Sequence, residues 1–476
     1  MRKIFFGTDG WRALLDSEIN STSVAVVARA FTDYVLAEAG PGATVAMAYD
    51  TRRCSKEFAE IFSRVLMAGG IEVLLSPDVT PTPVLSYTVL DRKCFAGVMI
   101  TASHNPAEYN GIKFKASYGG PFSQDQTRKV EEFLYANEPS FYQGTLPLYD
   151  MLPAYKAHIE PLIRWDVIKD VSLPLLVDSM GGAGGTLIQE ILAEHGCLSV
   201  KTIFGQPSHS FYGRLAEPIA RNLVPTCEEV RNGNYALCIA TDGDADRLGI
   251  VRDDGEFLSA QTTILLIVDY LKRVRGLKGG IVHTSSVTAK LKEHFLSENT
   301  PVHDVQVGFK YITDVMVGED ICFGGEESGG FGYGMHIPER DGVFSGLLFL
   351  EMLSSSAFKR LSDYVSSRER ELGKIYYDRI DAPCDRADRT DILPCLFESR
   401  LDNIAGIPVC GVQHFYSSRG IVNGLKYILQ GECRWLLIRS SETEPLLRFY
   451  SEGQTMEEVK TFLEEGVRLT SEIKTT

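Results

Sequence analysis

Three stretches of the chain repeat one pattern, in which an apolar strand is followed by a polar turn, an amphipathic helix and a second strand. The repeats begin at residues 44–49, 173–177 and 280–283. Each repeat is followed by a further apolar run that leads into a polar loop. Alternation of short apolar runs with amphipathic stretches predicts α/β units, and recurrence of one unit predicts similar domains. Unrelated α/β units would produce a comparable pattern, so both interpretations stay open at this point.

The C-terminal part has a different pattern. Alternating strands are expected at 424–430 and 434–439, and a helix at about 455–473. We therefore predict an α/β protein in which three similar α/β domains with mixed sheets, plus a smaller C-terminal α+β domain, surround a central cleft. The predicted domains are 1–145, 146–258, 259–370 and 371–476, and the last is expected to close over the cleft as a lid.

Charge and composition exclude several classes of function. The 476 residues carry a formal net charge of −15 and contain no Lys/Arg-rich block, so nucleic acid is not an expected partner. No apolar run approaches the length of a membrane span. The ten cysteines include no Cys-x-x-Cys pair, which is typical of reduced, buried thiols. Because the N-terminus also lacks a signal-peptide pattern, we expect a cytoplasmic protein, as a monomer or a homodimer.

The first chemically informative loop is Thr101–Pro106. It follows the apolar run 95–100, so Ser103 is expected on a tight turn at a strand's carboxyl end, where open α/β sheets bind ligands. A serine hydroxyl is a weak nucleophile and needs activation or prior phosphorylation. Taken alone, the loop could equally be a turn that its own side chains stabilise.

The second loop carries three carboxylates, at Asp242, Asp244 and Asp246. In an extended segment this spacing places all three side chains on one side. Clustered carboxylates repel one another, and a hard divalent cation with oxygen ligands, such as Mg²⁺, would relieve that repulsion. The alternative is a solvated acidic turn.

Two further loops suit a sugar and a phosphate. The glycine-rich loop 324–330 offers carboxylates and a hydroxyl to sugar hydroxyls, and Arg439 and Arg448 offer planar guanidinium groups that match phosphate. Three more cations are expected near the loops, although each could be an ordinary surface residue: Arg12, Lys113 and Lys310. One reaction needs all of these groups, namely relocation of a phosphoryl group within a sugar through a serine and a bisphosphorylated intermediate.

Together these motifs resemble the α-D-phosphohexomutase superfamily, from the stretch 6–10 to the arginine loop near the C-terminus. The resemblance implies that Ser103 is a phosphoserine and, with Asp242, Asp244 and Asp246, a ligand of Mg²⁺. It also implies that proton transfer and charge neutralisation involve His104, Lys113 and Lys310. The substrate-binding residues that it implies are Arg12, Arg247, Glu326, Ser328, His336, Arg340, Arg439, Ser441, Thr443 and Arg448.

Within the superfamily, the loop 325–330 and the stretch 308–310 are most similar to those of phosphoglucomutases. Relatives that act on mannose or glucosamine phosphates usually carry methionine or glutamine where this chain has Glu327. The expected activity is therefore Mg²⁺-dependent interconversion of glucose 1-phosphate and glucose 6-phosphate, primed by glucose 1,6-bisphosphate. The alternatives are a phosphomannomutase, a phosphoglucosamine mutase, a phosphoserine-based phosphatase or a non-catalytic sugar-phosphate-binding relative. Glu442 departs from the glycine that many members carry in the phosphate loop.

Overall fold

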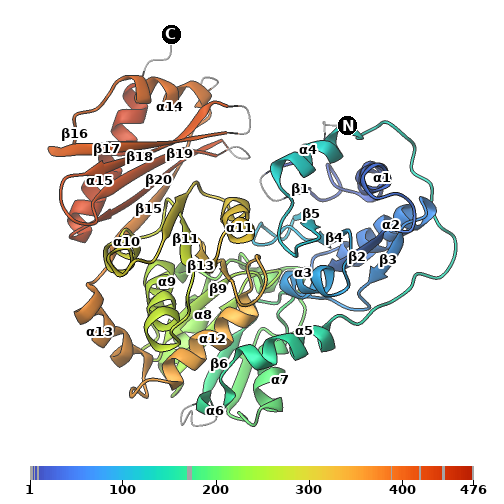
Figure 1. Cartoon of the computed structure of the whole chain (residues 1–476), viewed down its shortest axis with the longest axis horizontal. Helices are drawn as coiled ribbons and strands as arrows, with labels where there is room; N and C mark the ends of the chain where they lie inside the picture. The colour runs from blue at the N-terminus through green and yellow to red at the C-terminus, as the bar shows by residue number, and fades with distance from the viewer. Residues whose placement is uncertain are drawn as a thin grey trace.

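The computed structural model describes residues 4, 6–7, 10–168, 174–386, 389–417, 420–441 and 445–473. Within these residues the strands form four sheets. Figure 1 shows the N-terminal sheet at one end of the molecule and the C-terminal sheet at the other, with the middle of the chain between them. This arrangement confirms the predicted fold class of three α/β domains and a distinct C-terminal domain.

The first sheet has the order β1-β5-β4-β2-β3. Its strands are β1 (Trp11–Leu14), β2 (Thr44–Tyr49), β3 (Glu72–Leu75), β4 (Ala96–Ile100) and β5 (Tyr109–Ala116). Its helices are α1 (Ser21–Glu38), α2 (Ser55–Ala68), α3 (Thr82–Asp91) and α4 (Gln124–Glu132). The strands β2, β3 and β4 are parallel, and β5 is antiparallel to β4.

The second sheet has the order β10-β9-β8-β6-β7. Its strands are β6 (Leu175–Asp178), β7 (Val200–Ile203), β8 (Leu237–Thr241), β9 (Leu248–Arg252) and β10 (Phe257–Leu258). The helices are α5 (Leu152–Ile159), α6 (Trp165–Ile168), α7 (Leu187–Glu194) and α8 (Val224–Asn232), with short 3₁₀ turns at Glu160–Leu162, Phe211–Gly213 and Ala220–Asn222.

The third sheet has the order β12-β11-β13-β14. Its strands are β11 (Gly280–Thr284), β12 (Val302–Val305), β13 (Ile321–Gly325) and β14 (Phe331–Tyr333). The helices are α9 (Ala260–Asp269), which continues as a π-helical turn at Tyr270–Val274, α10 (Lys290–Phe295), which continues as a 3₁₀ turn at Leu296–Glu298, α11 (Phe309–Gly318), α12 (Gly342–Ser354) and α13 (Leu361–Leu372).

The three sheets repeat one topology. From the outer parallel strand inward, their orders are β3-β2-β4-β5, β7-β6-β8-β9 and β12-β11-β13-β14. In each, the first three strands are parallel and the fourth is antiparallel to the third. The prediction of three similar α/β domains is therefore confirmed. Since parallel strands end at the same sheet edge, each unit offers loops at its carboxyl ends.

The C-terminal sheet is antiparallel throughout, in the order β15-β20-β19-β18-β17-β16. Its strands are β15 (Tyr376–Pro383), β16 (Asn403–Ile404), β17 (Ile407–Tyr416), β18 (Val422–Leu429), β19 (Trp435–Ser440) and β20 (Leu446–Gly453). Helices α14 (Arg389–Glu398) and α15 (Met456–Glu472) share a core with one face of the sheet. Trp435, Leu437 and Tyr450 form a separate cluster that packs against Ala289 and Val307 of the third domain.

Helix α12 joins the second and third domains through one continuous core. Most of its residues are buried, and it packs on β8, β9 and α7 of the second domain. A helix that is apolar all round belongs in a protein interior, and this one fixes the two domains relative to each other. In the described part of the chain, we find no helix with the length and apolar character needed to cross a membrane.

Shortening a buried side chain of α12 should therefore destabilise both the second and the third domain. Leu347 is fully buried, whereas Leu296 is 56% exposed. We expect Leu347→Ala to cost about 2–5 kcal/mol, because it removes buried methyl groups and leaves a cavity. Leu296→Ala, the matched control, should cost less than about 0.5 kcal/mol. Calorimetric unfolding would measure both, and equal midpoints for the two variants would contradict a shared core.

Candidate active site

The serine loop is held in a strained turn directly after β4. Ser103 is fully buried and has a φ of 52°, a left-handed conformation that non-glycine residues adopt infrequently. Its backbone N–H donates to the hydroxyl of Thr101 at 2.8 Å, and that hydroxyl donates to Asp50 at 2.6 Å. The turn therefore has a fixed shape before any ligand binds.

Arg52 fixes the same loop through an ion pair and hydrogen bonds to its backbone. Its buried guanidinium pairs with Asp50 at 3.2 Å. It also donates to four backbone carbonyls, those of Ser103 (2.7 Å), Asn105 (2.6 Å), Pro106 (2.7 Å) and Tyr109 (2.9 Å). Sequence analysis did not single out Arg52. The available signal was its place in the polar turn after the strand 44–49, which corresponds in the other two units to the turns after 173–177 and 280–283 and not to the loops that carry the predicted chemistry.

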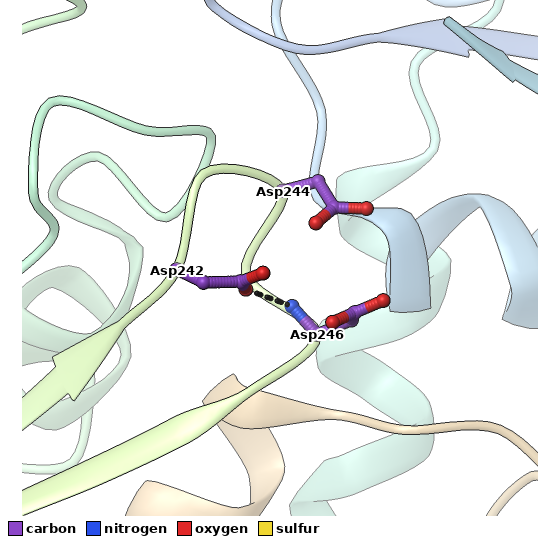
Figure 2. Close-up of side chains that lie close together, drawn as sticks. All are labelled: Asp242, Asp244 and Asp246. Carbon is purple, nitrogen blue, oxygen red and sulfur yellow. Dashed lines mark hydrogen bonds between the residues drawn. The ribbon is translucent and has the colours of Figure 1, made fainter. Parts of the chain in front are cut away.

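The three aspartates lie on the loop after β8, and Figure 2 shows their side chains close together. All three are fully buried, and their ligand atoms lie within 4.8 Å of one another. Asp242 accepts a hydrogen bond from the backbone N–H of Asp246 at 2.9 Å and one from the Ser103 hydroxyl at 3.0 Å. The structure thus brings the predicted nucleophile and the predicted metal ligands together.

This group fits a divalent cation. The Oδ1 atoms of Asp244 and Asp246 are buried and have no hydrogen-bond partner, which is costly for a carboxylate unless a cation or a proton compensates it. Burial and the charges of its two neighbours raise the pKa of Asp242 well above its usual range. Clustered oxygen ligands with further coordination positions for a phosphoryl oxygen suit Mg²⁺.

Cations from the first and third domains pair with the aspartates of the second. Lys113, on β5, donates to Asp244 at 2.8 Å and to Asp246 at 3.0 Å. Arg340, from the third domain, pairs with Asp246 at 2.9 Å. Although burial would raise the pKa of Asp244, the ammonium of Lys113 holds it below its usual value. These pairs stabilise carboxylates that would otherwise be buried without counter-charges.

Three more of the predicted residues adjoin this centre. Arg247 follows the aspartates and pairs with Glu217 at 3.2 Å. Arg12 donates to the side chain of Asn105 in the serine loop at 2.9 Å. The Nδ1 of His104 lies 3.4 Å from the Ser103 hydroxyl. Burial, reinforced by nearby arginines, lowers the pKa of His104 well below its usual value, so these surroundings keep its ring neutral and disfavour its protonation.

The loop predicted to bind the sugar follows β13. Glu326 accepts a hydrogen bond from the backbone N–H of Gly308 at 3.1 Å and lies 3.8 Å from Arg340. Burial outweighs the attraction of Arg340 and raises the pKa of Glu326 to about 7. Ser328 is half-buried on the same loop, and Lys310, at the start of α11, lies over the ring of Tyr311.

The two arginines of the predicted phosphate loop face each other across neighbouring strands. Arg439 on β19 is the register partner of Arg448 on β20. The backbone N–H of Ser441 donates to the Leu446 carbonyl at 3.0 Å and closes the base of the loop. Arg439 also lines a cavity between the third and C-terminal domains, together with Ser285. The predicted residue Thr443, like Glu442, lies outside the described residues.

His336 lies in a different environment from the other predicted residues. Its Nε2 is 2.8 Å from Asp341 and its Nδ1 is 2.9 Å from Nε2 of His158. Asp341 also accepts a hydrogen bond from Tyr155 at 2.7 Å and caps α12. Because both ring nitrogens are paired within the protein, we do not include His336 among the proposed substrate contacts.

Comparison with protein families agrees with this geometry. Residues 3–140, 153–255 and 259–371 match the α/β/α domains I, II and III of phosphoglucomutase/phosphomannomutase, and residues 398–469 match its C-terminal domain. The chain belongs to the phosphoglucomutase/phosphomannomutase family. It is therefore a phosphohexomutase, an isomerase of the α-D-phosphohexomutase superfamily.

Proteins of similar sequence or structure match this phosphohexomutase over nearly its whole length. A Thermococcus gammatolerans protein named as a probable phosphoglucosamine mutase is 29% identical over 98% of both chains. A Thermococcus kodakarensis protein named phosphoglucomutase/phosphomannomutase is 27% identical over the same share of each. A solved structure from Thermus thermophilus, provisionally named a phosphomannomutase, has a TM-score of 0.85 and 32% identity, with 98% of this chain and 99% of that one covered.

The contact between the aspartate loop that follows β8 and the serine loop depends on a glycine. A Cβ atom on Gly243 would lie 2.4 Å from the carbonyl oxygen of Ser103. We expect Gly243→Ala to push the two loops apart and to lower kcat by about 100-fold, since small misplacements of reacting groups have effects of that size. A steady-state mutase assay would measure it. Gly411→Ala, where a Cβ meets nothing within 4 Å, is the control, and equal activity of the two variants would contradict the expected clash.

Proposed function

We propose that this phosphohexomutase is a Mg²⁺-dependent phosphoglucomutase that interconverts glucose 1-phosphate and glucose 6-phosphate through a phosphoserine at Ser103. The observation that carries the proposal is the Ser103 hydroxyl, 3.0 Å from Asp242 within a buried triad of aspartates. A transferring phosphoryl group concentrates negative charge, and catalysis of such transfer relies on positioning and on neutralising that charge.

The residues around Ser103 have separable roles in the proposal. Asp242, Asp244 and Asp246, with the serine's phosphoryl group, would hold Mg²⁺, which when bound neutralises charge on that group. Nδ1 of His104 lies 3.4 Å from the Ser103 hydroxyl, and the negative charge of a bound phosphoryl group would favour protonation of the ring, which makes His104 a candidate for proton transfer. Lys113 keeps two of the aspartates oriented through its hydrogen bonds.

The remaining residues would bind the rest of the substrate. Arg12, Arg247 and Arg340 surround the reacting phosphoryl group with positive charge. Glu326 would accept hydrogen bonds from the sugar hydroxyls, and Ser328 would donate to them or accept from them. Lys310 is a second candidate for proton transfer. The distal phosphate would bind at Arg439, Ser441, Thr443 and Arg448. In this scheme glucose 1,6-bisphosphate is the intermediate and the priming compound.

The serine assignment predicts a covalent mark. Wild-type protein incubated with glucose 1,6-bisphosphate and Mg²⁺ should gain one phosphoryl group, about 80 Da, at Ser103, as read by intact mass and peptide mapping. Ser103→Ala should gain no mass and should lose turnover by at least about 10⁴-fold, as removal of a nucleophile does. Ser471→Ala, on the exposed face of α15, is the control. Substantial activity in Ser103→Ala would exclude Ser103 as the nucleophile.

The preferred sugar can be identified by comparing kcat/KM among the sugar phosphates. We expect the highest kcat/KM with glucose phosphates, by about tenfold or more over mannose phosphates, the size of effect that a few pocket contacts produce. Coupled assays at fixed Mg²⁺ and primer would give the ratios.

A phosphoglucosamine mutase is the second candidate. Relatives carry that name, and the buried carboxylate of Glu326 could pair with an amino group. A preference for glucosamine phosphates would overturn the glucose assignment and keep the mutase. Binding of the primer without exchange would favour a non-catalytic relative, and release of free phosphate would favour a phosphatase.

A further inference from the structure

Glu327 follows Glu326 in the sugar loop, but its carboxylate contacts Ser286 and Arg379 of the protein itself. Its side chain is only 8% exposed. One carboxylate oxygen accepts a hydrogen bond from the Ser286 hydroxyl at 2.6 Å, and the other lies 3.7 Å from the Nη1 atom of Arg379. Arg379 belongs to β15 of the C-terminal domain, so this contact crosses from the third domain to the fourth.

Arg379 is itself held in a defined orientation. Its Nε and Nη2 atoms donate to the two oxygens of Asp381 at 2.7 and 2.6 Å, and its guanidinium lies 5.4 Å from the ring centre of Tyr450. Burial alone would raise the pKa of Asp381, but the hydrogen bonds from Arg379 hold it below its usual value. A bidentate pair of this kind fixes geometry as well as charge.

Asp381 continues the contact toward the phosphate loop. It is the register partner of Arg448 across β15 and β20, and its Oδ1 lies 3.9 Å from Nε of Arg448. Arg448 in turn lies opposite Arg439. An alternating series of charges, Glu327–Arg379–Asp381–Arg448, therefore runs from the sugar loop of the third domain to the phosphate arginines of the fourth. We call it the charge series below.

We infer that Arg379 is a positioning residue that couples sugar recognition to phosphate recognition; the inference rests on the proposed function. Without Arg379, Asp381 would keep its negative charge beside Arg448 and compete with the substrate's phosphate. Glu327 would lose its cationic partner, and the sugar loop would lose its contact with the C-terminal domain. Both effects weaken binding, and neither touches the reacting atoms.

The coupling should also retain the bisphosphorylated intermediate. That intermediate must present each of its phosphates in turn to the serine, so the sugar and phosphate loops must both hold it in two orientations. If the two loops act independently, escape of the intermediate becomes more frequent. A variant that breaks the charge series should then need more glucose 1,6-bisphosphate to sustain turnover, which a purely structural defect would not require.

The test is a double-mutant cycle on the full chain with Arg379→Met, Glu327→Gln and the double variant. We expect Arg379→Met to raise KM for glucose 1-phosphate about tenfold, with kcat changed less than about threefold, since contacting charged pairs commonly couple by this amount. The half-saturating concentration of glucose 1,6-bisphosphate should rise in parallel. The double variant should be no worse than Arg379→Met alone, and Arg379→Lys should recover part of the loss.

Arg468→Met is the matched control, because Arg468 also pairs with two carboxylates but on the exposed face of α15. Multiplicative effects of the two single variants, or an unchanged KM and primer requirement in Arg379→Met, would overturn the inference. If Arg379→Met does not fold, Arg379→Lys and Asp381→Asn replace it in the same cycle. Absence of turnover in the wild type would instead reject the proposed function, and calorimetric affinity for glucose 1-phosphate would then test the coupling.

Discussion

The buried contact of Lys113 with Asp244 and Asp246 is the interaction on which the site depends. The ammonium and both carboxylates are fully buried, and they come from different domains. Arg340 adds a charge from a third domain to the same cluster. A buried charge without its partner costs several kcal/mol, so each domain would be penalised if it were separated from the others. The active centre is therefore a property of the docked domains and of none alone.

The repeated unit explains why the loops meet. In the first domain Asp50 directly follows β2 and accepts hydrogen bonds from the backbone N–H of Arg52 and from Thr101. In the second domain Asp178 ends β6 and accepts the corresponding bond from the backbone N–H of Met180, although its side-chain partner, Thr226, belongs to α8 and is not equivalent to Thr101. One local solution thus fixes the turn at the carboxyl edge of both sheets, and the loops that carry chemistry leave from that edge.

Local patterns were enough to predict the order of the elements and the chemical loops. The strand 44–49, the helix ending at Ala68 and the aspartate loop depend on nearby residues, which a single sequence contains. Arg52, Arg379 and the environment of His336 depend on partners far away in the chain. His158 and His336, for example, are 178 residues apart, and no spacing rule links them. The domain boundaries 1–145, 146–258, 259–370 and 371–476 stay predictions.

The lysines of strand β5 also constrain how the protein folds during its synthesis. Two residues along from Lys113, Lys115 is likewise fully buried and pairs with Glu339 of the third domain at 2.5 Å. Asp244 follows Lys113 by 131 residues in the sequence, and Glu339 follows Lys115 by 224 residues. When the first domain leaves the ribosome, both ammonium groups must stay hydrated on what will become an interior surface. Their loss of reactivity toward amine-labelling reagents would mark the moment at which the later domains dock.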